Sequence, residues 1–200
     1  MRDIRGLEPE PLANKLYGYL KKETETFTTN DGLRVHQHNR YSLHRILARL
    51  TDYVETQSGL PSHYVDYVSE GNTRFEIEHI WADHPERFTA EFPQLADFVE
   101  YRNRIGGLLL LPKSFNASYG DLIYTDKLPH YNTQNLLARS LHPLCYEHNP
   151  GFLGFMANSN LPFKPHPDFK KTDNDARTKL YQLIAQRIWN PDDLLHEVGK

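Results

Sequence analysis

Glu78, His79 and Asn116, in the middle of the chain, are side chains that could together hydrolyse a phosphodiester bond. The attacking water must lose a proton to a general base, and a neutral imidazole with a pKa of about 6.5 can take it at neutral pH. The leaving oxygen develops negative charge, which a divalent cation can neutralise while it also holds the phosphate. Such a cation needs only one or two protein ligands, because phosphate oxygens and water supply the others. The sequence therefore offers candidates for a base and for a cation site.

The elements that must position these side chains lie between residues 74 and 128. Residues 74–80 alternate apolar and polar side chains, which predicts a strand. A mostly helical insertion follows, and then Leu108–Leu111 form an apolar run closed by Pro112, which predicts a second strand. Ser114 opens a short helix that we expect to end before Pro129. The predicted order is strand, insertion, strand, helix.

Three motifs in this segment resemble those of a known enzyme family. They are Glu78-His79-Ile80, the stretch NRIGGLLLLPKSFN at residues 103–116, and Tyr124-Thr125-Asp126-Lys127. With these motifs the chain resembles the HNH (His-Me finger, ββα-metal) endonuclease domain. More narrowly, it resembles the C-terminal domain of GmrSD-type, modification-dependent restriction enzymes and their phage-defence relatives.

The resemblance implies roles for individual residues. His79 is then the general base, and Glu78 and Asn116 are ligands of Mg²⁺ or Mn²⁺. Asn116 and Lys127 count with His79 as catalytic residues, the lysine through its approach to the phosphate. The chain is accordingly expected to be a divalent-metal-dependent DNA endonuclease or nickase, a phosphodiester hydrolase of a restriction-modification or phage-defence system.

The resemblance also implies partners. The substrate is expected to be modified or foreign DNA. In the resembling family, an N-terminal nucleotide-hydrolysing domain precedes this one and recognises the modified DNA. The present sequence has no Walker-type phosphate-binding loop, so we expect it to be the C-terminal part of a longer protein.

One position departs from the family pattern. The middle Asn of that pattern falls at position 107, where this chain has Gly107. In the family this Asn braces the loop through hydrogen bonds. The nearby Asn103 could substitute for it.

The adjacency of Glu78 and His79 raises a geometric difficulty. Adjacent residues of a strand point to opposite faces of the sheet. Both side chains can face one cleft only if the strand ends or bulges at this point. Otherwise Asp83 or His84 becomes the better second ligand.

A small group of basic residues flanks the predicted site. The formal net charge of the chain is −3 and its pI is about 6.4, which excludes a histone-like polycation. Contact with DNA therefore requires a local patch. Arg102, Arg104 and Lys113 are the best candidates for contacts with the DNA backbone, and the alternative is that they form an ordinary solvated face.

The flanking segments are predicted to be helical. Leucines at positions 12, 16 and 20 indicate a first helix, Ser42 is a candidate N-cap for a second, and residues 172–189 carry the stripe of another. The predicted fold class is α+β, mainly helical, with an embedded ββα-metal unit. We expect a single domain over residues 1–200, with its core at 74–128 and helical flanks at 1–73 and 129–200.

The composition indicates a folded protein and gives no sign of a membrane span or a secretory signal. Hydrophobic residues make up 38% of the chain, enough for a core. No apolar run approaches the length of a membrane span, and the N-terminus has no secretory h-region. The single cysteine, Cys145, is consistent with a reducing compartment, and we expect a cytoplasmic location.

Two other functions are compatible with the sequence. The domain could be a catalytically inactive, HNH-like interaction or structural module, which Gly107 would suit. Alternatively, the chain could be a helical structural domain in which His142, Cys145 and His148 bind a zinc ion. Pro143 interrupts this run, and three ligands are one fewer than a structural zinc site requires.

Overall fold

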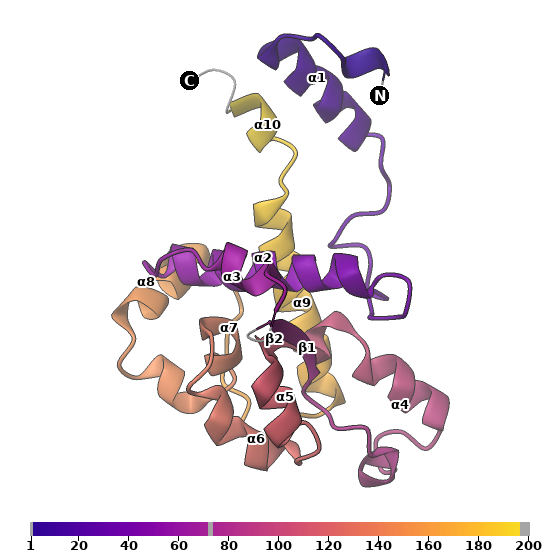
Figure 1. Ribbon diagram of the computed structural model, residues 1–200, viewed down its shortest axis with the longest axis vertical. Helices are drawn as coiled ribbons and strands as arrows, with labels where there is room; N and C mark the ends of the chain where they lie inside the picture. The colour runs from indigo at the N-terminus through magenta and orange to yellow at the C-terminus, as the bar shows by residue number, and fades with distance from the viewer. Residues whose placement is uncertain (1, 72–73, 197–200) are drawn as a thin grey trace.

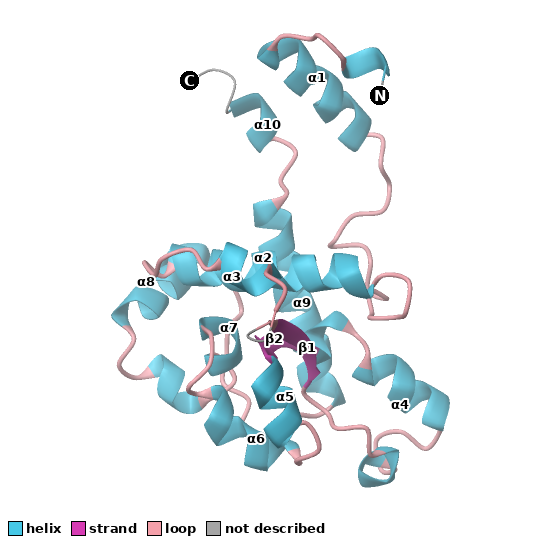
Figure 2. Ribbon diagram, viewed as in Figure 1, coloured by secondary structure: helices cyan, strands magenta, loops and turns pink. Residues whose placement is uncertain are grey.

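The computed structural model describes residues 2–71 and 74–196, which are mainly helical (Figure 1, Figure 2). The longer helices are α1 (Pro9–Leu20), α2 (Arg40–Gln57), α4 (Leu95–Arg102), α6 (Tyr124–Tyr131), α8 (Pro150–Ser159) and α9 (Lys171–Ile188). The shorter helices are α3 (Tyr64–Val68), α5 (Lys113–Tyr119), α7 (Leu136–Arg139) and α10 (Asp193–His196), and 3₁₀ turns occur at Arg2–Ile4, Pro85–Phe88, Ile105–Gly107 and Pro143–Tyr146. None of the described helices combines the length and the apolar character that crossing a bilayer requires.

A two-stranded antiparallel sheet forms the centre of the described chain (Figure 2). Strand β1 (Phe75–His79) pairs with β2 (Leu108–Pro112), with His79 opposite Leu108. Helix α5 follows β2 directly. The predicted mainly helical α+β class and the predicted order of strand, insertion, strand and helix are therefore confirmed.

The sheet separates two apolar clusters because side chains alternate along each strand. Ile77 and Leu110 belong to the larger cluster, which includes the buried residues of α2, α8 and α9. Leu109 and Leu111 belong to the second cluster, which includes side chains of α5 and α6. β2 is buried on both faces, which explains its unbroken run of leucines.

Helix α9 packs closely against the 3₁₀ turn that leads into β2. The turn contains Gly106, and a Cβ atom at that position would collide with the backbone of Asn174 and Thr178 in α9. Glycine is required here because two backbones meet with no space for a side chain between them. This contact fixes the start of β2 relative to α9.

Helices α1 and α10 pack on each other and lie apart from the sheet, at the top of Figure 1. The connection from α9 to α10 and the segment after α1 run side by side down to the body of the molecule in this view. Phe27 of that segment stacks on Trp189, with their ring centroids 4.9 Å apart. The terminal helices therefore do not take part in positioning His79.

The predicted short helix ending before Pro129 is α5, which ends at Tyr119, and a further helix was not predicted. The structure has two helices here, and Pro129 lies inside the second one, α6. A proline at this position cannot donate a hydrogen bond to the carbonyl of Thr125, and its ring crowds that carbonyl. The helix ends two residues later, at Tyr131, so little of it is affected. Similarly, the second predicted helix begins at Arg40, before the expected cap Ser42.

Candidate active site

His79 is the last residue of β1, and its ring is half-buried. Its Nε2 atom lies 2.9 Å from Oδ1 of Asn103. Nδ2 of the same amide donates to the carbonyl of Val99 at 2.8 Å, which fixes the orientation of the amide. Since Oδ1 can only accept, Nε2 of His79 must carry the hydrogen. Nδ1 of the neutral ring therefore keeps a free lone pair.

The environment of His79 keeps its ring neutral. Burial, followed by the positive charges of Arg102 and Arg40, lowers the pKa of His79 to about 4. Burial acts because it penalises the charged form of the imidazole. At neutral pH, almost every molecule therefore has an imidazole that is able to accept a proton.

Asn103 is held in place by its backbone as well as by its amide. Its carbonyl accepts a hydrogen bond from Val35 at 2.8 Å, and the N–H of Ile105 donates to Leu33 at 3.0 Å. The segment at 33–35 thus runs antiparallel to the segment at 103–105, with a bridge between Arg34 and Arg104. The group that orients His79 is tied to an N-terminal segment far away in sequence.

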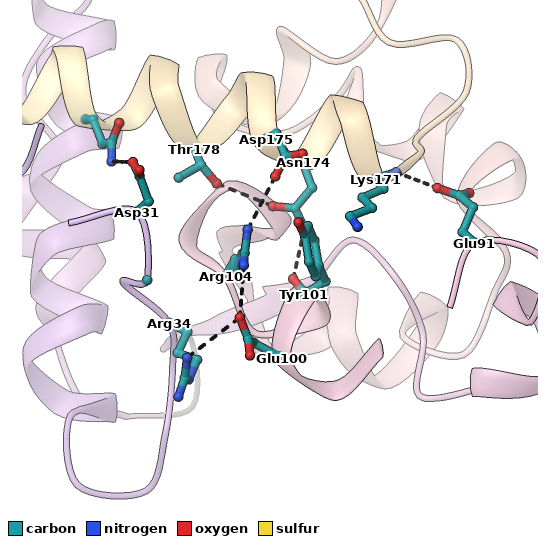
Figure 3. Close-up of polar contacts among 12 residues, drawn as sticks. Asp31, Arg34, Glu91, Glu100, Tyr101, Arg104, Lys171, Asn174, Asp175 and Thr178 are labelled. Atoms are coloured by element: carbon teal, nitrogen blue, oxygen red, sulfur yellow. Dashed lines mark hydrogen bonds and ion pairs between the residues drawn. The ribbon is translucent and has the colours of Figure 1, made fainter. Parts of the chain in front are cut away.

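Helix α9 braces the same loop from the other side (Figure 3). Nδ2 of Asn174, a fully buried residue, donates to the carbonyl of Tyr101 at 2.9 Å, and the Thr178 hydroxyl donates to its Oδ1 at 3.4 Å. A Cβ atom at Gly107 would lie 2.8 Å from Nδ2 of Asn174. Asn174 therefore fills the space beside position 107, and the loop is ordered without the family's middle Asn.

The arginines predicted to contact the DNA backbone are engaged within the protein. Nη2 of Arg104 pairs with Glu100 at 2.9 Å and Nη1 with Asp175 at 3.4 Å, and its guanidinium stacks on the Tyr101 ring at 3.7 Å (Figure 3). Nε of Arg102 donates to the carbonyl of Trp81 at 3.1 Å. Lys113, the third predicted contact, is exposed at the start of α5.

Glu78 points to the opposite face of the sheet from His79 and is buried there. Its Oε1 lies 2.7 Å from Nζ of Lys127 and accepts a hydrogen bond from the Tyr131 hydroxyl at 3.3 Å. Nζ of Lys127 also donates to the backbone carbonyl of His79 at 2.9 Å. The ammonium group thus connects the carboxylate to the end of β1.

The burial of this pair determines what the two groups can do. The side chain of Lys127 is 0% exposed, so it has no surface with which to approach a phosphate. Burial raises the pKa of Glu78 and lowers the pKa of Lys127, and the mutual attraction of the pair opposes both shifts. A carboxylate already neutralised by an ammonium group is a poor cation ligand, which argues against Glu78 in that role.

Asn116 is better suited to a hard cation. It is the fourth residue of α5, not its N-cap, and the adjacent Phe115 anchors the helix in the second apolar cluster. Its Oδ1 atom is buried and has no hydrogen-bond partner among the described residues, a condition that Asn132 shares. Buried polar atoms are normally paired, so an unpaired oxygen of this kind fits a ligand that is still to be supplied.

Asp83 and His84, the alternative cation ligands suggested by the sequence, lie in the loop after β1. Asp83 is exposed, with Oδ1 4.0 Å from Nε of Arg102, and Nδ1 of His84 lies 2.8 Å from Oε1 of Glu86. Over residues 2–71 and 74–196, no three His, Cys, Asp or Glu side chains come together as a metal-binding group. The structure therefore does not assemble a zinc site from His142, Cys145 and His148; the ring of His142 instead accepts a hydrogen bond from the backbone of Leu144.

Some of the residues that organise this site give no signal in the sequence. Asn174 and Tyr131 belong to ordinary helical stretches, and only the tertiary structure brings them to the loop and to Glu78. Asn103 could be identified, because it lies in the motif next to the position of the missing Asn.

Comparison with protein families gives a match over most of the chain. The family model described as "GmrSD restriction endonucleases, C-terminal domain" matches residues 21–192. No curated protein and no solved structure gives a significant match. The matched segment contains His79, Asn103, Asn116, Lys127 and Asn174, and leaves out α1 and α10.

Proposed function

Because the chain belongs to the family of C-terminal domains of GmrSD restriction endonucleases, we propose that it is a divalent-metal-dependent DNA endonuclease of the HNH type with His79 as its general base. The observation that carries this proposal is the hydrogen bond from Nε2 of His79 to Asn103. It leaves Nδ1 free to accept a proton, and burial keeps the ring neutral at pH 7. A base must be unprotonated before it can act, so this arrangement suits the role.

In the proposed reaction, Nδ1 of His79 takes the proton of the water that attacks the phosphorus. Asn103 acts as a positioning residue, because it fixes the tautomer and the direction of the ring. Lys127 is a positioning residue as well, since it fixes the carbonyl of His79 from the opposite face. This role replaces the contact with phosphate that the resemblance implied for Lys127.

The proposed cation is Mg²⁺ or Mn²⁺, held through Oδ1 of Asn116 together with phosphate oxygens and water. Such a cation supplies charge neutralisation at the phosphate and at the leaving oxygen when it is bound. The support for Asn116 is its unpaired buried oxygen. Glu78 is left out of the ligand set because its carboxylate pairs with Lys127 at 2.7 Å.

The base can be tested by nicking of a supercoiled plasmid in Mg²⁺ or Mn²⁺. His79→Ala should lower the rate by about 10²- to 10⁴-fold, the usual contribution of a general base. His63→Ala is the matched control, because this histidine is exposed, pairs with the exposed Asp66 and has no place in the proposed site. Circular dichroism shows whether both variants keep the fold. Equal rates for His79→Ala and the wild-type chain would remove His79 from the mechanism.

The cation site can be tested without an activity assay. A ligand that binds only the folded state stabilises it by about 2.7 kcal/mol at a hundredfold excess over its Kd. Mg²⁺ should therefore raise the Tm of the wild-type chain, and Asn116→Ala should abolish the rise. Asn132→Ala removes an equally unpaired buried oxygen elsewhere in the chain, so it should keep the rise.

A second candidate function is an inactive module with the same fold. It is favoured by the pairing of Glu78, which leaves the cation site with Asn116 as its only proposed protein ligand. An inactive module should show neither nicking nor stabilisation by Mg²⁺ or Mn²⁺. Both proposals assume modified or foreign DNA in the cytoplasm, selected by an N-terminal nucleotide-hydrolysing domain.

A further inference from the structure

A cleft of 390 Å³ lies beside β1, on the side of the strand that faces α2. It is lined by the first turns of α2, by residues 68–70 at and after the end of α3, and by residues 74 and 75 at the start of β1. Nε2 of His44 lies 2.9 Å from the carbonyl of Phe75, which ties α2 to the start of β1. The polar and charged lining residues are Gln37, Arg40, Tyr41, His44, Arg45, Ser69, Glu70 and Arg74.

The cleft is basic although the chain as a whole is acidic. Three arginines face a single acidic residue, Glu70, across the lining. Arg74 is neutralised by Glu76, with Nη2 and Oε1 2.7 Å apart. Arg40 and Arg45 form no ion pair within the part of the chain that the structure describes. The net charge of −3 therefore conceals a concave site in which two arginines face the single carboxylate of Glu70.

The arrangement of Arg45 suits recognition of an anion. Its guanidinium lies 3.6 Å from the centre of the Tyr41 ring, which is 64% exposed. A guanidinium stacked on an aromatic ring is held in orientation while its N–H groups at the edge stay available to an acceptor. Phosphate oxygens match that planar set of donors, in pairs.

The cleft adjoins the start of β1, the strand that ends with His79. Phe75 lines the cleft, and residues 75, 77 and 79 of a strand share one face. Four strand residues span about 13 Å at about 3.3 Å each. One DNA strand advances about 3.4 Å per nucleotide along the duplex, so this distance corresponds to about four nucleotides. Arg40 lies near enough for its charge to lower the pKa of His79.

We propose that Arg40 and Arg45 bind the phosphate backbone of the substrate DNA within about four nucleotides of the bond beside His79. The inference rests on the proposed function, because that function supplies DNA as the ligand. It replaces Arg102 and Arg104, which are engaged within the protein, as the principal basic contact. The recognised chemistry is the phosphodiester backbone, so the contact should not depend on DNA sequence.

The test measures DNA binding in a chain that cannot cut. The full chain with His79→Ala is titrated onto a fluorescently labelled DNA duplex between 50 and 200 mM salt, and anisotropy is recorded. Adding Arg40→Gln and Arg45→Gln together should weaken binding on the order of 10- to 100-fold at 0.1 M salt and lower the slope of log K against log[salt] by about 2. Arg49→Gln is the matched control, since Arg49 is exposed on the same helix but does not line the cleft.

Each outcome decides the proposal. Rescue by Arg40→Lys with Arg45→Lys supports charge recognition, and circular dichroism verifies that α2 is intact. The proposal is overturned if the double Gln variant binds DNA as tightly as Arg49→Gln does. It is also overturned if the parent chain does not bind DNA. If the wild-type chain nicks plasmid but the Gln variant binds normally, only this inference fails. If the cleft binds DNA but no chain nicks, the proposed catalysis and the distance to the cut bond both fail, and only the contact of Arg40 and Arg45 with the DNA backbone stands.

Discussion

Replacing Glu78 by Gln should destabilise the fold far more than the same replacement at Glu76, two residues earlier in the same strand. The Glu78 carboxylate is 2.7 Å from Nζ of Lys127, and their side chains are 5% and 0% exposed. Removing one partner of a buried ion pair leaves the other charge unpaired and typically costs about 3–5 kcal/mol. Glu76 pairs with Arg74 at 2.7 Å, but these side chains are 26% and 49% exposed. Loss of such a surface pair costs about 0–1 kcal/mol.

The assays are urea unfolding and thermal unfolding at pH 7.5, both followed by circular dichroism. For a chain of this size, about 3–5 kcal/mol corresponds to a fall in Tm of about 6–20 °C. A cycle of the single variants Glu78→Leu and Lys127→Met and the double variant that combines them isolates the pairwise energy. The double variant should be more stable than either single variant, since it buries no unpaired charge.

The same variants separate two roles for Glu78. If the carboxylate serves the ion pair alone, Glu78→Gln should lower stability but keep the rise in Tm that Mg²⁺ produces. The reasoning is refuted if Glu78→Gln costs no more than Glu76→Gln, or if it abolishes the effect of Mg²⁺ while Asn116→Ala keeps it.

Three more measurements test the environment of the site. Arg102→Met removes a cation that lowers the pKa of His79, so the acidic limb of the pH–rate profile should move to higher pH; an unmoved limb contradicts this electrostatic effect. Burial is the main cause that lowers the pKa values of both His79 and His166 to about 4. The unfolded chain therefore binds more protons than the folded chain below pH 6.5. The free energy of unfolding should be at its full value above that pH and should fall by about 2 kcal/mol per histidine at pH 5. Urea unfolding measures this fall, with His166→Gln as the comparison. Gly107→Ala should cost about 1–3 kcal/mol because its Cβ would meet Asn174, and Asn174→Ala should absorb part of that cost, which a double-mutant cycle detects.

The sequence was sufficient for the elements around His79. Alternation predicted β1 and the leucine run predicted β2, because both patterns come directly from burial on one face or on two. The opposite directions of Glu78 and His79 also follow from alternation, and the structure has them. Local pattern therefore predicts which face of the sheet a side chain occupies.

The partners of these side chains could not be predicted in the same way. Lys127 lies in a recognisable motif, but only the position of α6 under the sheet shows that its ammonium group is buried against Glu78. Asn174 lies on α9, and no spacing relates it to position 107. Arg40 and Arg45 resemble solvated helix residues until the path of β1 closes a cleft over them. Contacts between distant segments depend on packing, which short sequence patterns do not encode.

The two faces of the sheet carry different groups, His79 on one face and the buried Glu78–Lys127 pair on the other. On the face toward α2, His79 keeps a free nitrogen and lies near Arg40, so a phosphate could be bound there. On the other face, Glu78 is buried and paired with Lys127. Lys127 connects the two faces, because one ammonium group satisfies the carboxylate and the backbone carbonyl of His79. Removing Lys127 should therefore shift the backbone of His79, the proposed base, because it releases the carbonyl at the end of β1.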